Sequence, residues 1–275
     1  MNQTTVGVLG AGRIGRMHTE NLVHHVAGAR VKAVASPHLD EDWAEELGIA
    51  VRSTDNSAVL DDAEIEAIVI TASSGHHGEL IQQAAAVGKH IFCEKPVGFD
   101  EGSIEEAIAA AKTAGIQLQV GFNRRFDPDV LRLAESVRNG EVGELHGLRV
   151  INRDPSAPPI DFVLRSGGMF FDFAIHDFDT IRFLSNSEIE EVFAAGAVLV
   201  DPEIGKAGDI DTAIITLRLV NGALCVIDNS RQARYGYDQR FEAFGSKGNL
   251  VVDNTRPTIK ESFLETGVYL SLIHI

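Results

Sequence analysis

Short apolar runs and helical patterns alternate along the first 120 residues. The apolar runs predict strands at residues 6–9, 31–35, 65–71, 90–93 and 117–121. The periodic segments between them predict helices at residues 13–26, 41–47, 79–87 and 104–113. Because strands that alternate with helices form parallel sheets, we expect this half of the chain to be an α/β fold with a doubly wound parallel sheet.

The pattern changes after Gly121. Helices are expected at residues 129–138 and 169–184, and strands at residues 145–151, 192–199, 212–219, 223–228 and 239–244. Turn signals such as Asn221-Gly222 separate some of these strands, which is typical of antiparallel pairing. We therefore predict two domains, residues 1–121 and 122–275. The second is expected to be an α+β domain with a mostly antiparallel open sheet.

The sequence GAGRIG forms a GxGxxG loop between the first predicted strand and the first predicted helix. Gly10 allows a tight turn, Gly12 lets the backbone approach a pyrophosphate, and Gly15 lets the helix pack closely on the strand. Arg13 and Ile14 lie in the same loop and are further candidate contacts. A glycine-rich turn without a ligand is the alternative. The strand before the loop and the helix after it favour a Rossmann domain that binds a dinucleotide.

Ser36 ends the second predicted strand, where an NAD-binding domain usually has an acidic residue that binds the ribose hydroxyls. The nearest acid, Asp40, is expected to start the next helix. Serine removes the charge that repels a 2′-phosphate, and Arg13 and His38 could donate hydrogen bonds to such a group. We therefore expect the cofactor to be NAD or NADP.

Three further residues suit catalysis. Lys95 follows the fourth predicted strand, at the edge where open α/β sheets bind ligands, and its ammonium could stabilise a substrate oxygen. An exposed turn lysine fits the spacing equally well. Asp172 and His176 are four residues apart, so a helix would place them on one face, as an orienting carboxylate and a general base or as a structural ion pair. The pattern alone leaves these alternatives open.

The charge balance restricts the partners. The chain has 24 Lys and Arg residues against 40 Asp and Glu residues, a formal net charge of −16. Nucleic acids and anionic membranes attract basic surfaces, so we expect neither as a partner. Cys93 and Cys225 belong to no CxxC pair, and we expect neither a disulfide framework nor a metal site. Without a signal-peptide pattern or a long apolar run, we expect a cytoplasmic protein that acts on a small molecule.

Several motifs together resemble those of the Gfo/Idh/MocA family of oxidoreductases. They are GAGRIG at 10–15, FCEKP at 92–96, VGFNRRFDP at 120–128, RDPSAPP at 153–159, SGGMFFDFAIHDFD at 166–179 and NSRQARYGYDQR at 229–240. The segments GFNRRFDP and YGYDQR are most similar to the inositol 2-dehydrogenase branch. The resemblance covers residues 5 to about 265.

The resemblance implies roles for the residues at matching positions. Lys95 would contact the reacting hydroxyl, and Asp172 and His176 would complete the catalytic group. The implied substrate contacts are Arg124, Asn152, Asp154 and Tyr235. Further candidate cofactor contacts are Thr71, His77 and Glu94. A homo-oligomer formed through the C-terminal sheet is also expected.

The expected function is NAD(P)-dependent oxidation of a secondary alcohol on a cyclic polyol, with myo-inositol giving the 2-keto product. The alternatives are an aldose dehydrogenase and a cofactor-dependent glycosidase of the same fold. A non-catalytic, cofactor-sensing regulator would not need Lys95, Asp172 and His176. Residues 266–275 do not resemble the family, so we expect a chain truncated or frame-shifted after about Glu265, with a poorly packed tail.

Overall fold

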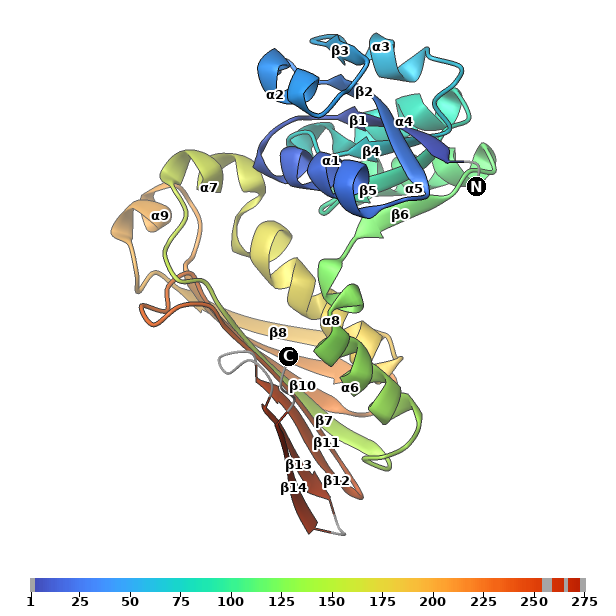
Figure 1. The fold of residues 1–275 in the computed structure, drawn as a ribbon. Helices are drawn as coiled ribbons and strands as arrows, with labels where there is room; N and C mark the ends of the chain where they lie inside the picture. The colour runs from blue at the N-terminus through green and yellow to red at the C-terminus, as the bar shows by residue number, and fades with distance from the viewer. Residues whose placement is uncertain (1–2, 254–258, 265–266, 273–275) are drawn as a thin grey trace. The chain divides into compact units, whose positions relative to one another are not determined.

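The N-terminal half forms a sheet of parallel strands. The computed structural model describes residues 3–253, 259–264 and 267–272, with side chains up to residue 253, and its contacts divide the chain into two units between Gly121 and Phe122. The strand order in the first unit is β3 (Val51–Ser53), β2 (Ala29–Ala35), β1 (Thr4–Leu9), β4 (Ala67–Ile70), β5 (His90–Glu94) and β6 (Leu118–Gly121) (Figure 1). Every neighbouring pair is parallel, which confirms the predicted doubly wound sheet.

Helices cover both faces of this sheet. Those on one face are α1 (Arg13–His25) and α2 (Glu41–Glu46). Those on the other are α3 (Ser57–Leu60), α4 (His77–Ala86), which follows the short 3-10 helix η1 (Ser74–His76), and α5 (Glu101–Thr113). Side chains alternate along a strand, so Val8 of β1 packs in the first core and Leu9 in the second. The carboxyl ends of the strands carry the glycine loop, Ser36 and Lys95, at the edge where such sheets bind ligands.

The second unit holds a mixed sheet. Its strand order is β14 (Gly267–Leu272), β13 (Ile259–Leu264), β12 (Gly248–Asp253), β11 (Asp238–Gly245), β7 (Leu145–Arg153), β10 (Leu224–Ser230), β9 (Thr212–Leu219) and β8 (Ile189–Ala197). β10 pairs with β7 in parallel, and the other neighbouring pairs are antiparallel. The prediction of a mostly antiparallel sheet is therefore confirmed.

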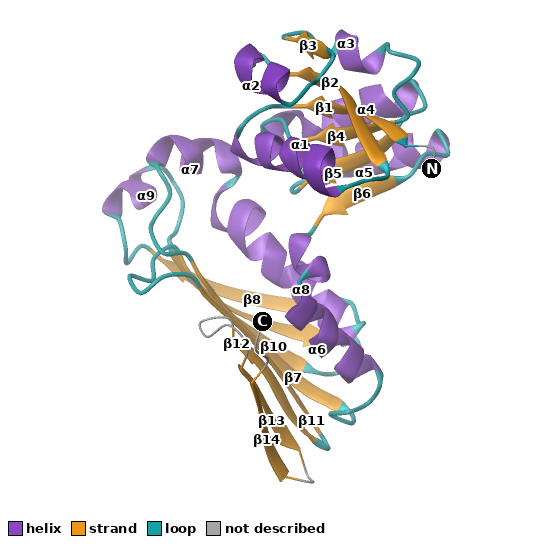
Figure 2. Ribbon diagram, in the orientation of Figure 1, coloured by secondary structure: helices purple, strands orange, loops and turns teal. Residues whose placement is uncertain are grey.

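Two helices, α6 (Pro128–Arg138) and α8 (Ile175–Ser185), lie over one face of this second sheet (Figure 2). Leu133 of α6 and Ile181 of α8 share a buried core with Ile215 and Phe241 of the sheet. Four shorter helices complete the described part of this unit: η2 (Asn123–Phe126), α7 (Ile160–Ser166), the π-helix η3 (Met169–Ala174) and α9 (Pro202–Lys206). No helix in the described part of the chain is long and apolar enough to cross a membrane.

The opposite face of the second sheet is exposed in this chain. Four large apolar side chains lie on this face. Side chains alternate along a strand, and each of these four residues either neighbours a buried core residue in its strand or is paired with a residue that does. They are Phe193, Ile214, Leu224 and Phe244, with exposed fractions between 44% and 69%. The same face also carries charged side chains such as Arg218 and Glu242, and the partly buried Val226.

Some elements differ from the sequence-based expectation. The helix expected at residues 169–184 begins as a π-helix, η3 (Met169–Ala174), before α8. Strands β12 to β14 were not predicted. The backbone of residues 267–272 pairs with β13, whereas residues 265–266 and 273–275 and the side chains of the tail lie outside the described residues. The expectation of a poorly packed tail therefore lies outside what the structure describes.

Candidate active site

The glycine loop between β1 and α1 is closely packed at two glycines and open at the third. Gly10 has a φ of +102°, and a Cβ there would lie 2.5 Å from the backbone nitrogen of Ala72. A Cβ at Gly15 would lie 2.1 Å from the carbonyl oxygen of Gly10. Beside Gly12, the residue before the first turn of α1, the described residues leave open space to 4 Å. Open space at a helix N-terminus, where backbone N–H groups have no helical partner, fits the pyrophosphate of a dinucleotide.

Three predicted cofactor contacts also make bonds within the protein. The Thr71 hydroxyl donates to the carbonyl oxygen of Gly10 at 2.8 Å, so it helps to hold the glycine loop. The two ring nitrogens of His77 lie 2.9 Å from the carbonyl oxygen of Ala72 and 2.7 Å from that of Pro96. His77 therefore ties the segment after β4 to the turn that carries Lys95. Glu94 Oε1 lies 2.8 Å from His18 Nε2 of α1.

Ser36 directly follows β2 and is buried. Asp40, the nearest acid, caps the N-terminus of α2 by accepting from the backbone N–H of Trp43 at 3.2 Å, and it also accepts from Arg16 Nη2 at 3.1 Å. These two contacts hold the pKa of the Asp40 carboxyl below its usual range, and the bond from the Trp43 backbone has the larger effect. The Asp40 carboxylate therefore caps α2 and pairs with Arg16. An acid that binds the ribose hydroxyls would be expected at position 36, where this chain has serine.

Lys95 directly follows β5 and is half-buried. Its neighbour Cys93 is fully buried, and burial raises the pKa of the Cys93 thiol. The thiol therefore stays protonated and is no nucleophile. Lys95 is the cation of this turn, and its ammonium is suited to contact a substrate oxygen.

Asp172 and His176 lie on one continuous segment that is not a regular α-helix. Asp172 belongs to the π-helix η3 and His176 to the first turn of α8. The expected α-helix is corrected to a π-helix over residues 169–174 that continues as an α-helix from Ile175. Both side chains are half-buried. The His176 ring packs edge-on to Phe122, with 6.4 Å between ring centroids.

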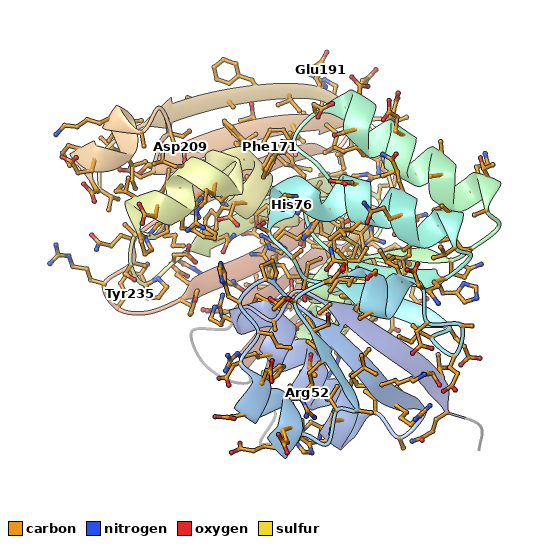
Figure 3. The ribbon with its side chains drawn as sticks, turned by 90° about the horizontal axis from the view of Figure 1, so that it is seen from above. Arg52, His76, Phe171, Glu191, Asp209 and Tyr235 are labelled. Carbon is orange, nitrogen blue, oxygen red and sulfur yellow. The ribbon has the colours of Figure 1, made fainter. Side chains whose placement is uncertain are left out.

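A carboxylate from outside the segment caps the π-helix. The backbone N–H of Met169 lies 3.1 Å from each carboxylate oxygen of Asp209, which sits beside the start of this helix (Figure 3). Gly168 has a φ of +75°, and a Cβ there would lie 2.7 Å from Asp209 Oδ1. Glycine is therefore needed for this approach, and the local sequence Gly167-Gly168 ends α7 and starts the site segment.

Arg124 and Asn152, two predicted substrate contacts, meet at the fully buried Asp177. Arg124 Nη1 donates to Asp177 Oδ1. Asn152 Nδ2 donates to Asp177 Oδ2 at 3.2 Å, and Asn229 Nδ2 donates to the same oxygen at 2.8 Å. The buried carboxylate is thus paired with a cation and two amides, as a buried charge requires. These contacts anchor α8, next to His176, to strands β7 and β10.

Asp154 and Asp172 meet a second buried cation, Arg231. Arg231 Nη1 lies 2.9 Å from Asp172 Oδ2 and 3.8 Å from Asp154 Oδ2. The structure thus brings together one predicted substrate contact and one predicted catalytic carboxylate. Their common partner follows β10 and is 1% exposed.

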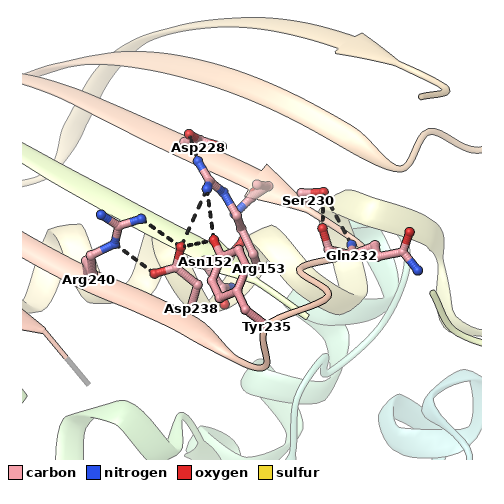
Figure 4. Close-up of polar contacts among 9 residues, drawn as sticks. Asn152, Arg153, Asp228, Ser230, Gln232, Tyr235, Asp238 and Arg240 are labelled. Carbon is pink, nitrogen blue, oxygen red and sulfur yellow. Dashed lines mark hydrogen bonds and ion pairs between the residues drawn. The ribbon is translucent and has the colours of Figure 1, made fainter. Parts of the chain in front are cut away.

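The Tyr235 hydroxyl belongs to a different ionic cluster from those that hold the other predicted substrate contacts. Its hydroxyl donates to Asp238 Oδ2 at 2.6 Å and accepts from Arg153 Nη1 at 3.3 Å (Figure 4). Arg153 and Asn152 are successive residues of β7, so Arg153 points to the sheet face opposite Asp177. Burial opposes ionisation of Asp238, but the bonds from Arg240 and Tyr235 outweigh it and hold the Asp238 pKa below its usual range. The Tyr235 hydroxyl is therefore hydrogen-bonded within the cluster of Arg153, Asp238 and Arg240.

Sequence reasoning missed Asp177, Asn229 and Arg231 as parts of the site. Asp177 directly follows His176, and the other two lie in the quoted motif NSRQARYGYDQR. Their proximity depends on the pairing of β7 with β10 and on the packing of α8 across them. A linear spacing carries no signal of such contacts.

Comparison with known proteins matches both halves of the chain. The model of the oxidoreductase family with an NAD-binding Rossmann fold matches residues 4–122, and that of the GFO/IDH/MocA C-terminal domain matches residues 130–251. The myo-inositol 2-dehydrogenase of Thermotoga maritima is 46% identical, covering 92% of this chain and 76% of its own. The inositol 2-dehydrogenase of Rhizobium meliloti is 44% identical, covering 91% and 76%.

A solved structure is also similar over nearly the whole chain. It is the scyllo-inositol dehydrogenase from Lactobacillus casei, with bound NAD(H) and scyllo-inositol. The TM-score is 0.86 at 32% sequence identity, and the match covers 98% of this chain and 82% of that one. In that protein, the similar fold binds a nicotinamide cofactor and a cyclic polyol.

Proposed function

Because this chain belongs to the Gfo/Idh/MocA family of oxidoreductases, we propose that it oxidises a secondary alcohol of a cyclic polyol, with myo-inositol giving the 2-keto product. The observation that carries the proposal is the η3–α8 segment, which presents the half-buried Asp172 and His176 beside two buried cations. The relatives named above as inositol dehydrogenases support the choice of substrate. An assay of cofactor reduction with myo-inositol tests it.

Each side chain has a proposed part in the reaction. NAD, when bound at the glycine loop, supplies the hydride acceptor. His176 accepts the proton of the reacting hydroxyl, as a group whose ordinary pKa lies near working pH. Asp172 orients the imidazole, and Lys95 donates a hydrogen bond that stabilises the negative charge developing on the oxygen. Asp154, close to Arg231, is suited to bind another hydroxyl of the polyol.

The cofactor preference follows from Ser36. We expect the protein to use NADP as well as NAD, because no carboxylate stands at position 36 to repel a 2′-phosphate and Asp40 is held in the α2 cap. Measuring kcat/KM for both cofactors with one polyol tests this. Ser36→Asp should shift the ratio toward NAD, whereas the control Asp40→Ala should change it little. A wild-type preference for NAD above about 100-fold, or about 2.7 kcal/mol, contradicts the prediction.

The exposed sheet face suggests self-association. We propose that copies of this chain pair through the face that carries Phe193, Ile214, Leu224 and Phe244, since exposed apolar patches rimmed by polar groups mark interaction sites. Light scattering should give a mass above that of one chain, and Ile214→Glu should lower it. Val220→Glu, at an exposed residue just after β9, serves as the control and should leave the mass unchanged. A monomeric wild type would rule out this interface.

We further propose that the protein works in the cytoplasm. Cys93 and Cys225 are free and buried, one in each unit. Burial raises the pKa of Cys225 to about 11 and raises that of Cys93 as well. Both cysteines are unlinked, which is the usual state of cysteines in a reducing compartment.

A further inference from the structure

Arg231 is a buried cation that the proposed reaction does not yet use. Its side chain is 1% exposed, and its backbone N–H donates to the carbonyl oxygen of Asp211 at 2.8 Å. The guanidinium carbon lies 5.0 Å from the centroid of the Phe173 ring, which belongs to η3. Arg231 is therefore packed against the same π-helix that carries Asp172.

The environment of the guanidinium is only partly satisfied. Nη1 donates to Asp172 at 2.9 Å, but among the described residues Nε and Nη2 are buried without a hydrogen-bond partner. A buried ion with unmet donors stabilises a fold poorly, and an apolar side chain of similar volume often does as well or better. Buried polar groups that lack hydrogen-bond partners are expected mainly at functional sites. Stability alone therefore does not account for an arginine at this position.

Among the described residues, two carboxylates form ion pairs with the guanidinium. Asp172 comes from η3, and Asp154 comes from the segment just after β7. Asp211, which accepts the backbone N–H, turns its own carboxylate to the N–H groups of residues 199, 200 and 201. Arg231 thus acts on the two carboxylates already assigned to catalysis and to substrate binding.

We infer that Arg231 is a positioning residue that keeps the Asp172 carboxylate ionised and fixed in direction, and that links it to Asp154. The expected kinetic effect rests on the proposed dehydrogenase function, whereas the contact between Arg231 and Asp172 does not. Removing a nearby positive charge favours the protonated form of an acid or a base. Without Arg231, the pKa of Asp172 should rise and the acidic limb of the kcat/KM profile should move to higher pH.

The test compares two arginines that hold carboxylates of the same helical segment. Arg125 makes two bonds to the buried Asp179 of α8, at 2.8 and 2.6 Å, and its guanidinium carbon lies 5.3 Å from the Phe183 ring centroid. Arg125→Gln is therefore the matched control for Arg231→Gln. Carbon-13 NMR of labelled aspartate carboxyls, with Asp172→Asn to assign the resonance, follows the Asp172 titration directly. Arg231→Lys is a second variant that serves if the glutamine variant folds poorly. It keeps a cation at this position and should raise the Asp172 pKa by a smaller amount.

The expected result is a higher Asp172 pKa in Arg231→Gln and an unchanged one in Arg125→Gln. With the polyol substrate, kcat should fall roughly 10- to 100-fold in Arg231→Gln, while the KM for NAD stays unchanged. A fall of this size corresponds to the loss of one charge-assisted hydrogen bond. An unchanged Asp172 titration, or equal kinetic losses in the two arginine variants, overturns the inference. If the wild type oxidises no polyol but the titration shifts as expected, the proposed function fails and the positioning role stands.

Discussion

Lys95→Ala is expected to lower kcat for polyol oxidation by roughly 10²- to 10⁴-fold while leaving the dissociation constant for NAD unchanged. Lys95 follows β5 at the carboxyl edge of the parallel sheet, and His77 holds the adjoining Pro96 in place. The alanine variant keeps this scaffold and the glycine loop but loses the ammonium that stabilises the reacting oxygen. Steady-state kinetics together with fluorescence titration of the cofactor measures both quantities. His176→Ala should lose turnover to a similar degree, because the proton acceptor is removed.

The control for this experiment is Lys112→Ala. Lys112 lies in the last turn of α5 and is exposed, so its removal should alter neither kcat nor cofactor binding. Loss of NAD binding in Lys95→Ala would make Lys95 a cofactor ligand instead. A change in kcat of less than about tenfold would remove it from the reacting centre.

Asp177→Ala is expected to destabilise the protein by about 3–5 kcal/mol, the usual cost of breaking a buried charge pair. The substitution leaves the buried Arg124 guanidinium without its carboxylate and removes the acceptor of two buried amides, those of Asn152 and Asn229. Urea unfolding followed by circular dichroism measures the change in the free energy of unfolding.

Two variants separate a buried charge from a general loss of contacts. Glu188→Ala breaks a bidentate pair with Arg182 that is exposed to solvent, so it should change the midpoint little. The double variant Arg124→Met with Asp177→Leu removes both charges and should recover part of the lost stability. A single Asp177→Ala variant as stable as Glu188→Ala would contradict the network described here.

The glycine loop and the first sheet could be predicted because their determinants are local in sequence. Each predicted apolar run of the first half is one strand, Gly10 shapes the loop by its positive φ, and Gly10 and Gly15 allow its close packing. Strand β3, three residues long, is too short to produce a periodic signal. The π-helix η3 was missed because its apolar pattern is that of an α-helix, and its start depends on the distant Asp209.

The polar site of the second unit could be predicted only in part. The motifs and the family resemblance pointed to Asp172, His176, Arg124 and Asn152, yet the partners of these residues depend on strand register and helix packing, which sequence spacing does not report. Tyr235 illustrates the limit: the motif placed it with the substrate contacts, whereas in the structure its hydroxyl joins the cluster around Asp238. Its role in substrate binding stays a prediction.

The most direct test of the proposed function is an absorbance assay of nicotinamide reduction with a panel of cyclic polyols, aldoses and an aryl glycoside. We predict net reduction of NAD with myo-inositol or a stereoisomer of it, and loss of this signal in both Lys95→Ala and His176→Ala. Faster reduction with an aldose would identify a sugar dehydrogenase on the same site. Release of the aryl group without net reduction, and no reaction with any cyclic polyol, would contradict the proposed function.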